Sequence, residues 1–368
     1  MSITLDKFLT TDELSLPKTR KATDGSYQAF LEHCFSNYRV KIDLVNSTSR
    51  YLEQEISQQK YIAFELCEVL KNIVDEYLRG FPNKAYSILE TFLNDHNALW
   101  KPLISPSTMN KQLEYLYRMR IGEGQILTKK DLFHIPFQLR SKVQTQRYSI
   151  PGLPCLYVGG SLYVCWEEMG RPVLAHTHIA RIATHGLGIK ILDLGFTPHL
   201  LNIFANQHFE ELSTHNDITD FIKSNILLWP LLVACSIRVL EPFNPFKVEY
   251  IIPQLVLQWI TSEKSDIDGI RYFSTHIDYE TTTTHFSSNY AFPAKTNADM
   301  GFCSHLMGKF QMTEPLSWEF ARAVKPPSTS SPNAFSQIQV AKGVVKGYLD
   351  TEFELMECYL NIMQCSPM

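Results

Sequence analysis

Residues 147–172 read RYSIPGLPCLYVGGSLYVCWEEMGRP, and this stretch decides the fold that we expect. A turn framed by prolines and a glycine precedes the apolar run CLYV, and two glycines then lead into SLYVCWEE. A β-branched and aromatic run bounded by turn residues is typical of a strand. The apolar and aromatic content of SLYVCWE is typical of a helix packed on a sheet. The stretch therefore predicts a strand and then a helix, with charged residues at both ends.

Similar short runs follow further along the chain, namely HIARIA, IKILDLG, GIRYFST and NYAFPA. Longer stretches at 217–240 and 253–262 have helical character, and we expect a terminal helix at about 335–364. Strands mixed with irregularly spaced helices indicate an α+β domain rather than a regular βαβ series. We expect this domain over residues 112–310 and a C-terminal extension with the terminal helix over 311–368.

The first hundred residues have a different texture. YIAFELCEVLKNIVDEYLRGFP places apolar residues at helical spacing, with Gly80 as a stop signal and Pro82 just beyond it. KPLISPSTMN, which begins at Lys101, has the proline and serine content of a connector. We therefore expect a helical N-terminal domain over residues 1–105.

Composition limits the class of protein. Hydrophobic residues make up 45% and charged residues 20% of 368, as in an ordinary globular protein, and the net charge is −4. This charge favours neither nucleic acid nor an anionic membrane. The longest apolar run is interrupted by Pro230 and is too short for a bilayer. The acidic start lacks the apolar core of a secretory signal, and the eight cysteines are irregularly spaced, so we expect reduced thiols in a cytoplasmic protein.

Three side chains of the opening stretch could form a ligand site. Arg147 has a planar fork of donors that suits phosphate oxygens. Tyr157 offers a ring and a hydroxyl within the strand, and Glu168 offers a carboxylate at the end of the helix. The alternative is that Arg147 and Glu168 are surface charges and Tyr157 is a core residue, because arginine and glutamate are mostly exposed in proteins.

A series of ordered blocks favours the ligand site. The blocks LYRMRIGE, FHIPFQLRSKVQTQRYSIPGLPCLYVGG, SLYVCWEEMGRP, YIIPQLVLQWI, GIRYFST and NYAFP resemble the RES family over about residues 112–295. This family consists of bacterial proteins named for an arginine, a glutamate and a serine in their active site, and many are toxins that consume NAD. The resemblance implies an α+β fold related to the ADP-ribosyltransferase toxins, with NAD bound in a cleft between two small sheets.

The resemblance also implies roles for particular residues. The family's site residues fall at Arg147, Tyr157, Glu168 and Ser274. Arg118, in LYRMR, occupies an early arginine position near the cofactor phosphates, and its neighbour Arg120 remains an alternative. The family's usual Trp-Asn after the arginine is Tyr148-Ser149 here, which changes the expected contacts to ribose. The N-terminal hundred residues and the C-terminal tail have no counterpart in small family members.

Glu167 and Glu168 are adjacent, so the choice between them needs an argument. Neighbours on a helix point about 100° apart, and only one of them can face a given cleft. The family spacing favours Glu168, and Glu167 is then expected on a solvated face.

The residue types suit cleavage of the bond between nicotinamide and ribose. Nicotinamide leaves readily, and positive charge develops on the ribose as it leaves. A fixed carboxylate stabilises this charge, and loss of such a group costs on the order of 3 kcal/mol of barrier. The resemblance gives this role to Glu168, while Arg147 and Arg118 hold the pyrophosphate. It places Tyr157 against nicotinamide and lets Ser274 orient Glu168 or the ribose.

Other clusters in the sequence carry less weight. His176, His178 and His185 lie close together but lack an acid or cysteine at metal-ligand spacing, so we expect no metal. Cys155 with a histidine could imitate a thiol nucleophile, but the apolar surroundings of Cys155 and Cys165 favour buried core positions. The two glycines after the strand lack the pattern of a Rossmann or phosphate-binding loop.

We therefore expect an NAD⁺-degrading enzyme that acts as a bacterial toxin or antiphage effector, with NAD as its substrate. The acceptor of the ribose is open: water, phosphate or a protein side chain. The expected partners are an antitoxin or regulatory protein and further copies of the chain, with no nucleic acid and no membrane. The alternative is a non-catalytic nucleotide-binding or interaction module.

Overall fold

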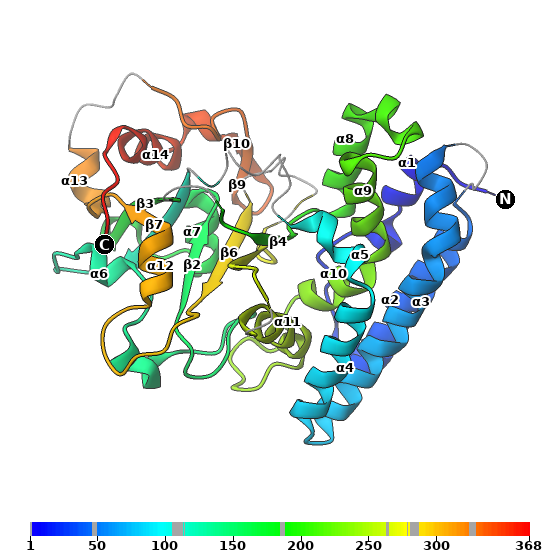
Figure 1. The fold of residues 1–368 in the computed structure, drawn as a ribbon. Helices are drawn as coiled ribbons and strands as arrows, with labels where there is room; N and C mark the ends of the chain where they lie inside the picture. The colour runs from blue at the N-terminus through cyan, green and yellow to red at the C-terminus, as the bar shows by residue number, and fades with distance from the viewer. Residues whose placement is uncertain are drawn as a thin grey trace. The chain divides into compact units, whose positions relative to one another are not determined.

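The computed structural model describes residues 2–45, 50–104, 113, 115–184, 188–262, 265–277, 279, 287–323 and 329–368. The chain forms two compact units. The helical unit comprises Met1–Pro106, Thr145–Ile150 and Leu192–Asp266, and the sheet unit comprises Ser107–Gln144, Pro151–Ile191 and Ile267–Met368. Helices and a mixed set of strands are both extensive (Figure 1), so the predicted α+β class is confirmed.

The helical unit is built around one long helix, α3 (Tyr51–Leu78). The helices α2, α4, α9, α10 and α11 all pack against it. The helix α3 ends just before Gly80, which has φ +92°, and Pro82 opens the next helix, as the sequence predicts. The helices of the unit are α1 (Leu5–Leu9), α2 (Tyr27–Asp43), α3, α4 (Pro82–Asp95), α5 (Asn97–Trp100), α8 (Pro198–Gln207), α9 (Asp217–Leu227), α10 (Trp229–Ser236) and α11 (Ile251–Thr261).

Residues 192–266 pack differently from the expected domain division. The prediction includes them in the second domain, whereas in the structure they form one unit with the N-terminal helices. The physical reason is burial: all eight residues of α10 are buried, and α9 and α10 both lie against α3. A helix that is apolar on every side needs a partner on every side.

The expected single helix at 217–240 is two helices. They meet at Leu228, and Pro230 lies in the first turn of α10, where its missing N–H needs no acceptor. Among the described residues no single helix has the length and apolar character to cross a membrane; α9 and α10 meet that test only together, and they are bent by 57°.

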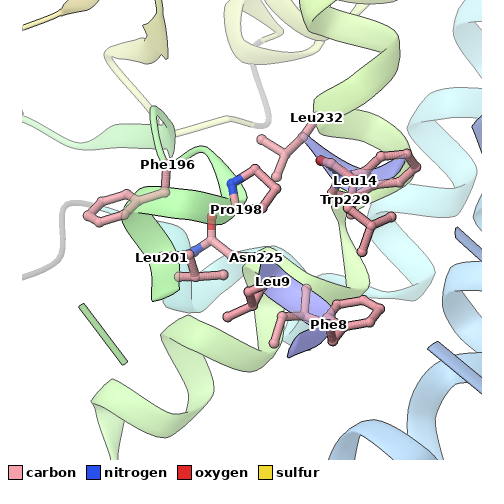
Figure 2. Close-up of a pocket in the computed structure, with 10 residues that line it drawn as sticks. Phe8, Leu9, Leu14, Phe196, Pro198, Leu201, Asn225, Trp229 and Leu232 are labelled. Atoms are coloured by element: carbon pink, nitrogen blue, oxygen red, sulfur yellow. Dashed lines mark hydrogen bonds between the residues drawn. The ribbon is translucent and has the colours of Figure 1, made fainter. Parts of the chain in front are cut away.

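A small cavity in the helical unit is almost entirely apolar (Figure 2). Asn225 is the polar residue of its lining, and its Nδ2 donates to the Phe221 carbonyl at 3.0 Å. The lining contains no titratable side chain, so the cavity offers packing surface rather than catalytic groups. Its lining residues are Phe8, Leu9, Leu14, Phe196, Pro198, Leu201, Asn225, Ile226, Trp229 and Leu232.

The sheet unit contains an antiparallel sheet with the strand order β5-β6-β2-β1-β3-β7, in which β8 also pairs with β3. A further strand, β4 (Ile191–Leu194), crosses the boundary between the units. The predicted strands at CLYV, HIARIA, GIRYF and NYAFP are confirmed. The strands are β1 (Leu116–Ile121), β2 (Cys155–Gly159), β3 (Thr177–Thr184), β5 (Gly269–Phe273), β6 (Ser288–Pro293), β7 (Phe310–Met312) and β8 (Leu316–Ser317).

The sheet is covered on both faces. Leu156 and Val158 of β2 pack into one hydrophobic cluster, together with Tyr290 and Phe292 of β6. Tyr117 of β1 belongs to a second cluster, with residues of α7, α13 and α14. Neighbouring strand residues point to opposite faces, which explains the alternation. The helices of this unit are α6 (Lys129–Leu132), α7 (Leu162–Glu168), α12 (Ser304–Lys309), α13 (Trp318–Arg322) and α14 (Glu352–Ile362).

The expected terminal helix at 335–364 is only partly helical. Its first part is a hairpin of β9 (Gln337–Ala341) and β10 (Val344–Gly347), and α14 follows. Gly343 occupies the turn with φ +76°. In the first strand the apolar Ile338 and Val340 alternate with the polar Gln337 and Gln339. An alternating run beside a turn glycine favours a hairpin over a helix.

Candidate active site around Glu168

The helix α7 holds Glu168, its last residue, in a defined place on the sheet. Ser161 caps the helix, since its Oγ accepts a hydrogen bond from the Val164 N–H at 3.1 Å. A Cβ at Gly159 would lie 2.5 Å from Val164 Cγ1 and 2.8 Å from Cys165 Sγ. The absence of a side chain at Gly159 therefore lets α7 lie directly on β2.

The C-terminal extension contacts the same, N-terminal end of α7. Glu357 of α14 is fully buried, and its Oε1 accepts from the Leu162 N–H at 2.8 Å and from the Tyr348 hydroxyl at 2.6 Å. Its Oε2 accepts from the Ser331 hydroxyl and from Asn333 Nδ2. Burial raises the pKa of Glu357 to about 7. The extension is thus part of the framework that positions α7.

Glu168 has one anchored carboxylate oxygen. The Ser274 hydroxyl donates to Oε1 at 2.6 Å, and Asn289 Nδ2 donates to the same atom at 2.7 Å. The other oxygen, Oε2, lies 3.8 Å from Nε2 of His276, whose side chain is 56% exposed. The Glu168 side chain is itself 32% exposed, so Oε2 lies on the accessible side of the group.

Ser274 is oriented by its own backbone contacts. It follows β5 and is fully buried, and its N–H donates to the Ser287 carbonyl at 2.9 Å. Its Oγ accepts from the His276 N–H at 3.1 Å. Because an ionised carboxylate can only accept, the hydroxyl proton of Ser274 is directed at Glu168.

Glu167 differs from the expectation of a solvated position. It is buried and forms a two-pronged pair with Arg171, whose Nε and Nη2 donate to Oε2 at 3.0 Å and to Oε1 at 2.8 Å. The reason is local: Arg171 follows the helix with φ +60° and comes back against the residue four positions earlier. Glu167 is therefore committed to a structural ion pair, and Glu168 is the carboxylate beside Ser274.

Arg118 and Tyr157 lie together where β1 meets β2 in the sheet. The strands β1 and β2 share the single register pair Tyr117–Gly159 in the described chain, and Arg118 Nη1 donates to the Tyr157 carbonyl at 2.7 Å. The Nε of Arg118 is buried and has no hydrogen-bond partner among the described residues, and burial lowers the pKa of this guanidinium. The alternative, Arg120, is exposed and donates to the Asp131 carbonyl.

Tyr157 lies near the residues that contact Glu168. On the paired strands, Tyr157 lies opposite Ala291 and Gly159 lies opposite Asn289. Residues on the same face at such diagonal positions are about 7–8 Å apart. Tyr157 and Asn289 therefore leave the same face of the sheet as near neighbours, and Asn289 contacts Glu168.

Arg147 belongs to the helical unit and is not among the residues that the sheet unit brings together. Its Nη1 and Nη2 each donate at 3.0 Å, to the carbonyls of Cys235 and Ile237. Its guanidinium also lies 5.2 Å from the ring centroid of Tyr250. These three contacts of the buried arginine lie within the helical unit.

The cysteines and histidines named from the sequence show no sign of a catalytic or metal-binding role in the described residues. Cys155 and Cys165 are buried, as predicted, and burial raises the pKa of each to about 12, so both stay protonated at neutral pH. No group of three metal-ligating side chains occurs among the described residues. His176 Nε2 lies 3.7 Å from Glu123 Oε1, and His185 is outside the described residues.

The chain has a curated relative in Bacillus subtilis (strain 168), "Putative toxin YopC". The two are 31% identical over 355 residues, which span 95% of this chain and 78% of the relative. The chain belongs to the YopC family. An alignment this long takes in most of both units, so the likeness to this relative includes the helical unit. No family model matches the chain, and no solved structure matches it.

Sequence reasoning missed Asn289 and His276. Asn289 lies in the block NYAFP, but its role depends on the register between β6 and β2, which no local pattern reveals. His276 is placed by the turn after Ser274. Only the folded pairing shows that both side chains face Glu168.

Proposed function

We propose that this protein is an NAD⁺-degrading enzyme that acts as a bacterial toxin, and that its sheet unit is related to the RES family and the ADP-ribosyltransferases. The observation that carries the proposal is the anchored carboxylate: Glu168 accepts from Ser274 through one oxygen and keeps the other accessible. The resemblance assigns catalytic roles to these two residues, and they are more than 100 positions apart in the chain.

The proposed reaction breaks the bond between the ribose carbon and the nicotinamide nitrogen. The bonding electrons leave with nicotinamide, which becomes neutral, and positive charge develops on the ribose. Glu168 Oε2 stabilises that charge without reorganising, because Oε1 is already held in place. With water as the acceptor, its oxygen bonds to the ribose carbon and its proton passes to solvent, giving ADP-ribose.

Arg118 and Tyr157 support the binding of NAD⁺ in this proposal. Arg118 is a partly buried cation whose Nε has no hydrogen-bond partner among the described residues, and a phosphate oxygen would satisfy it. Tyr157 provides a ring close to Asn289 for contact with nicotinamide. The resemblance gives Arg147 a phosphate-binding role as well.

The name of the relative and the proposed chemistry together support a biological role as a toxin. A toxin that depletes NAD⁺ would arrest growth of its own cell or of a phage-infected cell. We propose that it acts in the cytoplasm, that an antitoxin or its own helical unit restrains it, and that it forms a homo-oligomer.

The deciding experiment is incubation of the purified protein with NAD⁺, with and without phosphate, and analysis of the products by mass spectrometry. ADP-ribose indicates a glycohydrolase, phosphorylated ADP-ribose a phosphorylase, and a gain of ADP-ribose mass on protein a transferase. Glu168→Gln is the control that should lose each activity. If the wild type binds NAD⁺ but leaves it intact, the protein is a non-catalytic nucleotide-binding module rather than an enzyme.

A further inference from the structure

We infer that Asn289 is a positioning residue for Glu168, and that together with Ser274 it reserves Oε1 for structure and Oε2 for the substrate. This inference rests on the proposed function and identifies which atom of the carboxylate acts. None of the motif positions carried over from the resemblance includes Asn289.

The two donors reach the same atom from different strands. Ser274 follows β5 and donates at 2.6 Å, while Asn289 lies in β6 and donates at 2.7 Å. Ser274 is fully buried and Asn289 is 5% exposed, so neither donor exchanges freely with water. An oxygen with two buried donors has little capacity left for a ligand.

The position of Asn289 explains why it reaches Glu168. Asn289 lies opposite Gly159 on β2, and α7 packs directly on Gly159. The cross-strand neighbour of this glycine is therefore close to the helix that carries Glu168. Tyr272 of β5 lies opposite Asn289 on the other side, which fixes β6 between two partner strands.

The consequence is a directional carboxylate. Two neutral donors hold the side chain without cancelling its charge, and Oε2 remains beside the exposed His276. A substrate that carries a developing positive charge or a sugar hydroxyl meets Oε2. Loss of Asn289 leaves Oε1 with one donor and lets the carboxylate rotate.

The test compares kcat and KM for NAD⁺ cleavage in the wild type and in Asn289→Ala. Loss of one hydrogen bond to a charged group predicts a fall in kcat of about ten- to hundredfold, with KM changed by less than about threefold. Ser288→Ala is the matched control, since Ser288 is the preceding buried polar residue of β6 and its Oγ accepts from Arg271 Nε. The control should keep kcat.

A second variant separates positioning from structural damage. In a Glu168→Gln background, Asn289→Ala should lower the residual rate no further, because Asn289 acts through the carboxylate. A further loss there, equal to the loss in the wild type, would assign the effect to the fold and overturn the inference.

A third measurement does not depend on activity. Crystal structures of the wild type and Asn289→Ala should show one Glu168 conformation in the wild type and more than one, or a rotated one, in the variant. An unchanged carboxylate overturns the positioning role. A wild type that shows the Asn289 contact but cleaves no NAD⁺ instead overturns the proposed function.

Discussion

Two adjacent glutamates in this protein have opposite surroundings. Glu167 is buried against Arg171, whereas Glu168 is partly exposed and held by Ser274. One step along a helix turns a side chain by about 100°, which is enough to separate a structural ion pair from a site residue. The pair thus offers an internal control for the chemistry of the site.

We expect Glu168→Gln to lower the rate of NAD⁺ cleavage by at least about a hundredfold while leaving Tm nearly unchanged. Glu167→Gln should leave the rate nearly unchanged and lower Tm. It breaks the ion pair with the half-exposed Arg171, which costs about 1–2 kcal/mol of unfolding free energy. Activity assays and thermal unfolding of both variants check this. Equal loss of activity in the two would contradict the assignment of Glu168.

At the scale of elements, the helix α7 is fixed by the strand beneath it and at its N-terminal end. Gly159 lets the helix lie on β2, and Glu357 accepts the N–H of its first residue. The strand and the helix are visible in the local sequence pattern, but the partner of the helix is not. Glu357 lies 195 positions further along the chain than Leu162, and no periodicity links the two.

Gly159→Ala should displace α7 and with it Glu168. The added Cβ would approach Val164 and Cys165 within 2.8 Å, so the helix has to move. We expect a loss of about 1–3 kcal/mol of stability and a fall in kcat larger than that loss of folded protein explains. Gly308→Ala in α12 is the control, because its Cβ meets nothing within 4 Å. Unchanged kcat in Gly159→Ala would show that α7 tolerates the shift.

Glu357 predicts a pH dependence of stability. Burial raises its pKa in the folded protein to about 7, and a solvated glutamate titrates at about 4.3. Between these values the folded protein keeps a proton that the unfolded chain releases, so this contribution to stability is complete below about pH 4.3 and is lost as the pH rises through 7. Comparing Tm at pH 5 and pH 8 should show a smaller fall for Glu357→Gln than for the wild type. Identical pH dependence in both proteins would rule out this contribution.

At the scale of the whole molecule, local patterns predicted most elements but not their grouping. The helix that ends before Gly80 and the strands on either side of α7 follow from periodicity and turn residues. The association of residues 192–266 with the N-terminal helices depends on which apolar faces meet, and many pairings satisfy the same pattern. The hairpin at 337–347 differs from the expected helix because its alternating run is short and lies close to the helical stretch that follows it.

This grouping changes what a truncation should do. Deletion of residues 1–100 removes α3 and exposes the apolar surface of α10, whose residues are all buried in the full chain. We expect the shortened protein to aggregate rather than to remain as a soluble domain with altered toxicity. Expression and size-exclusion chromatography of residues 101–368 check this. A soluble, monodisperse product would show that residues 192–266 fold without the N-terminal helices.

The junction between β1 and β2 has a mechanical consequence. Among the residues that the structure describes, the two strands share one register pair, Tyr117–Gly159, and Arg118 reaches across to the Tyr157 carbonyl just beyond it. A planar ring inserted at this point would disrupt one main-chain pair between the strands rather than a series of pairs. Opening the sheet between β1 and β2 therefore costs little main-chain pairing, and the opening would lie beside the partly buried Arg118 guanidinium.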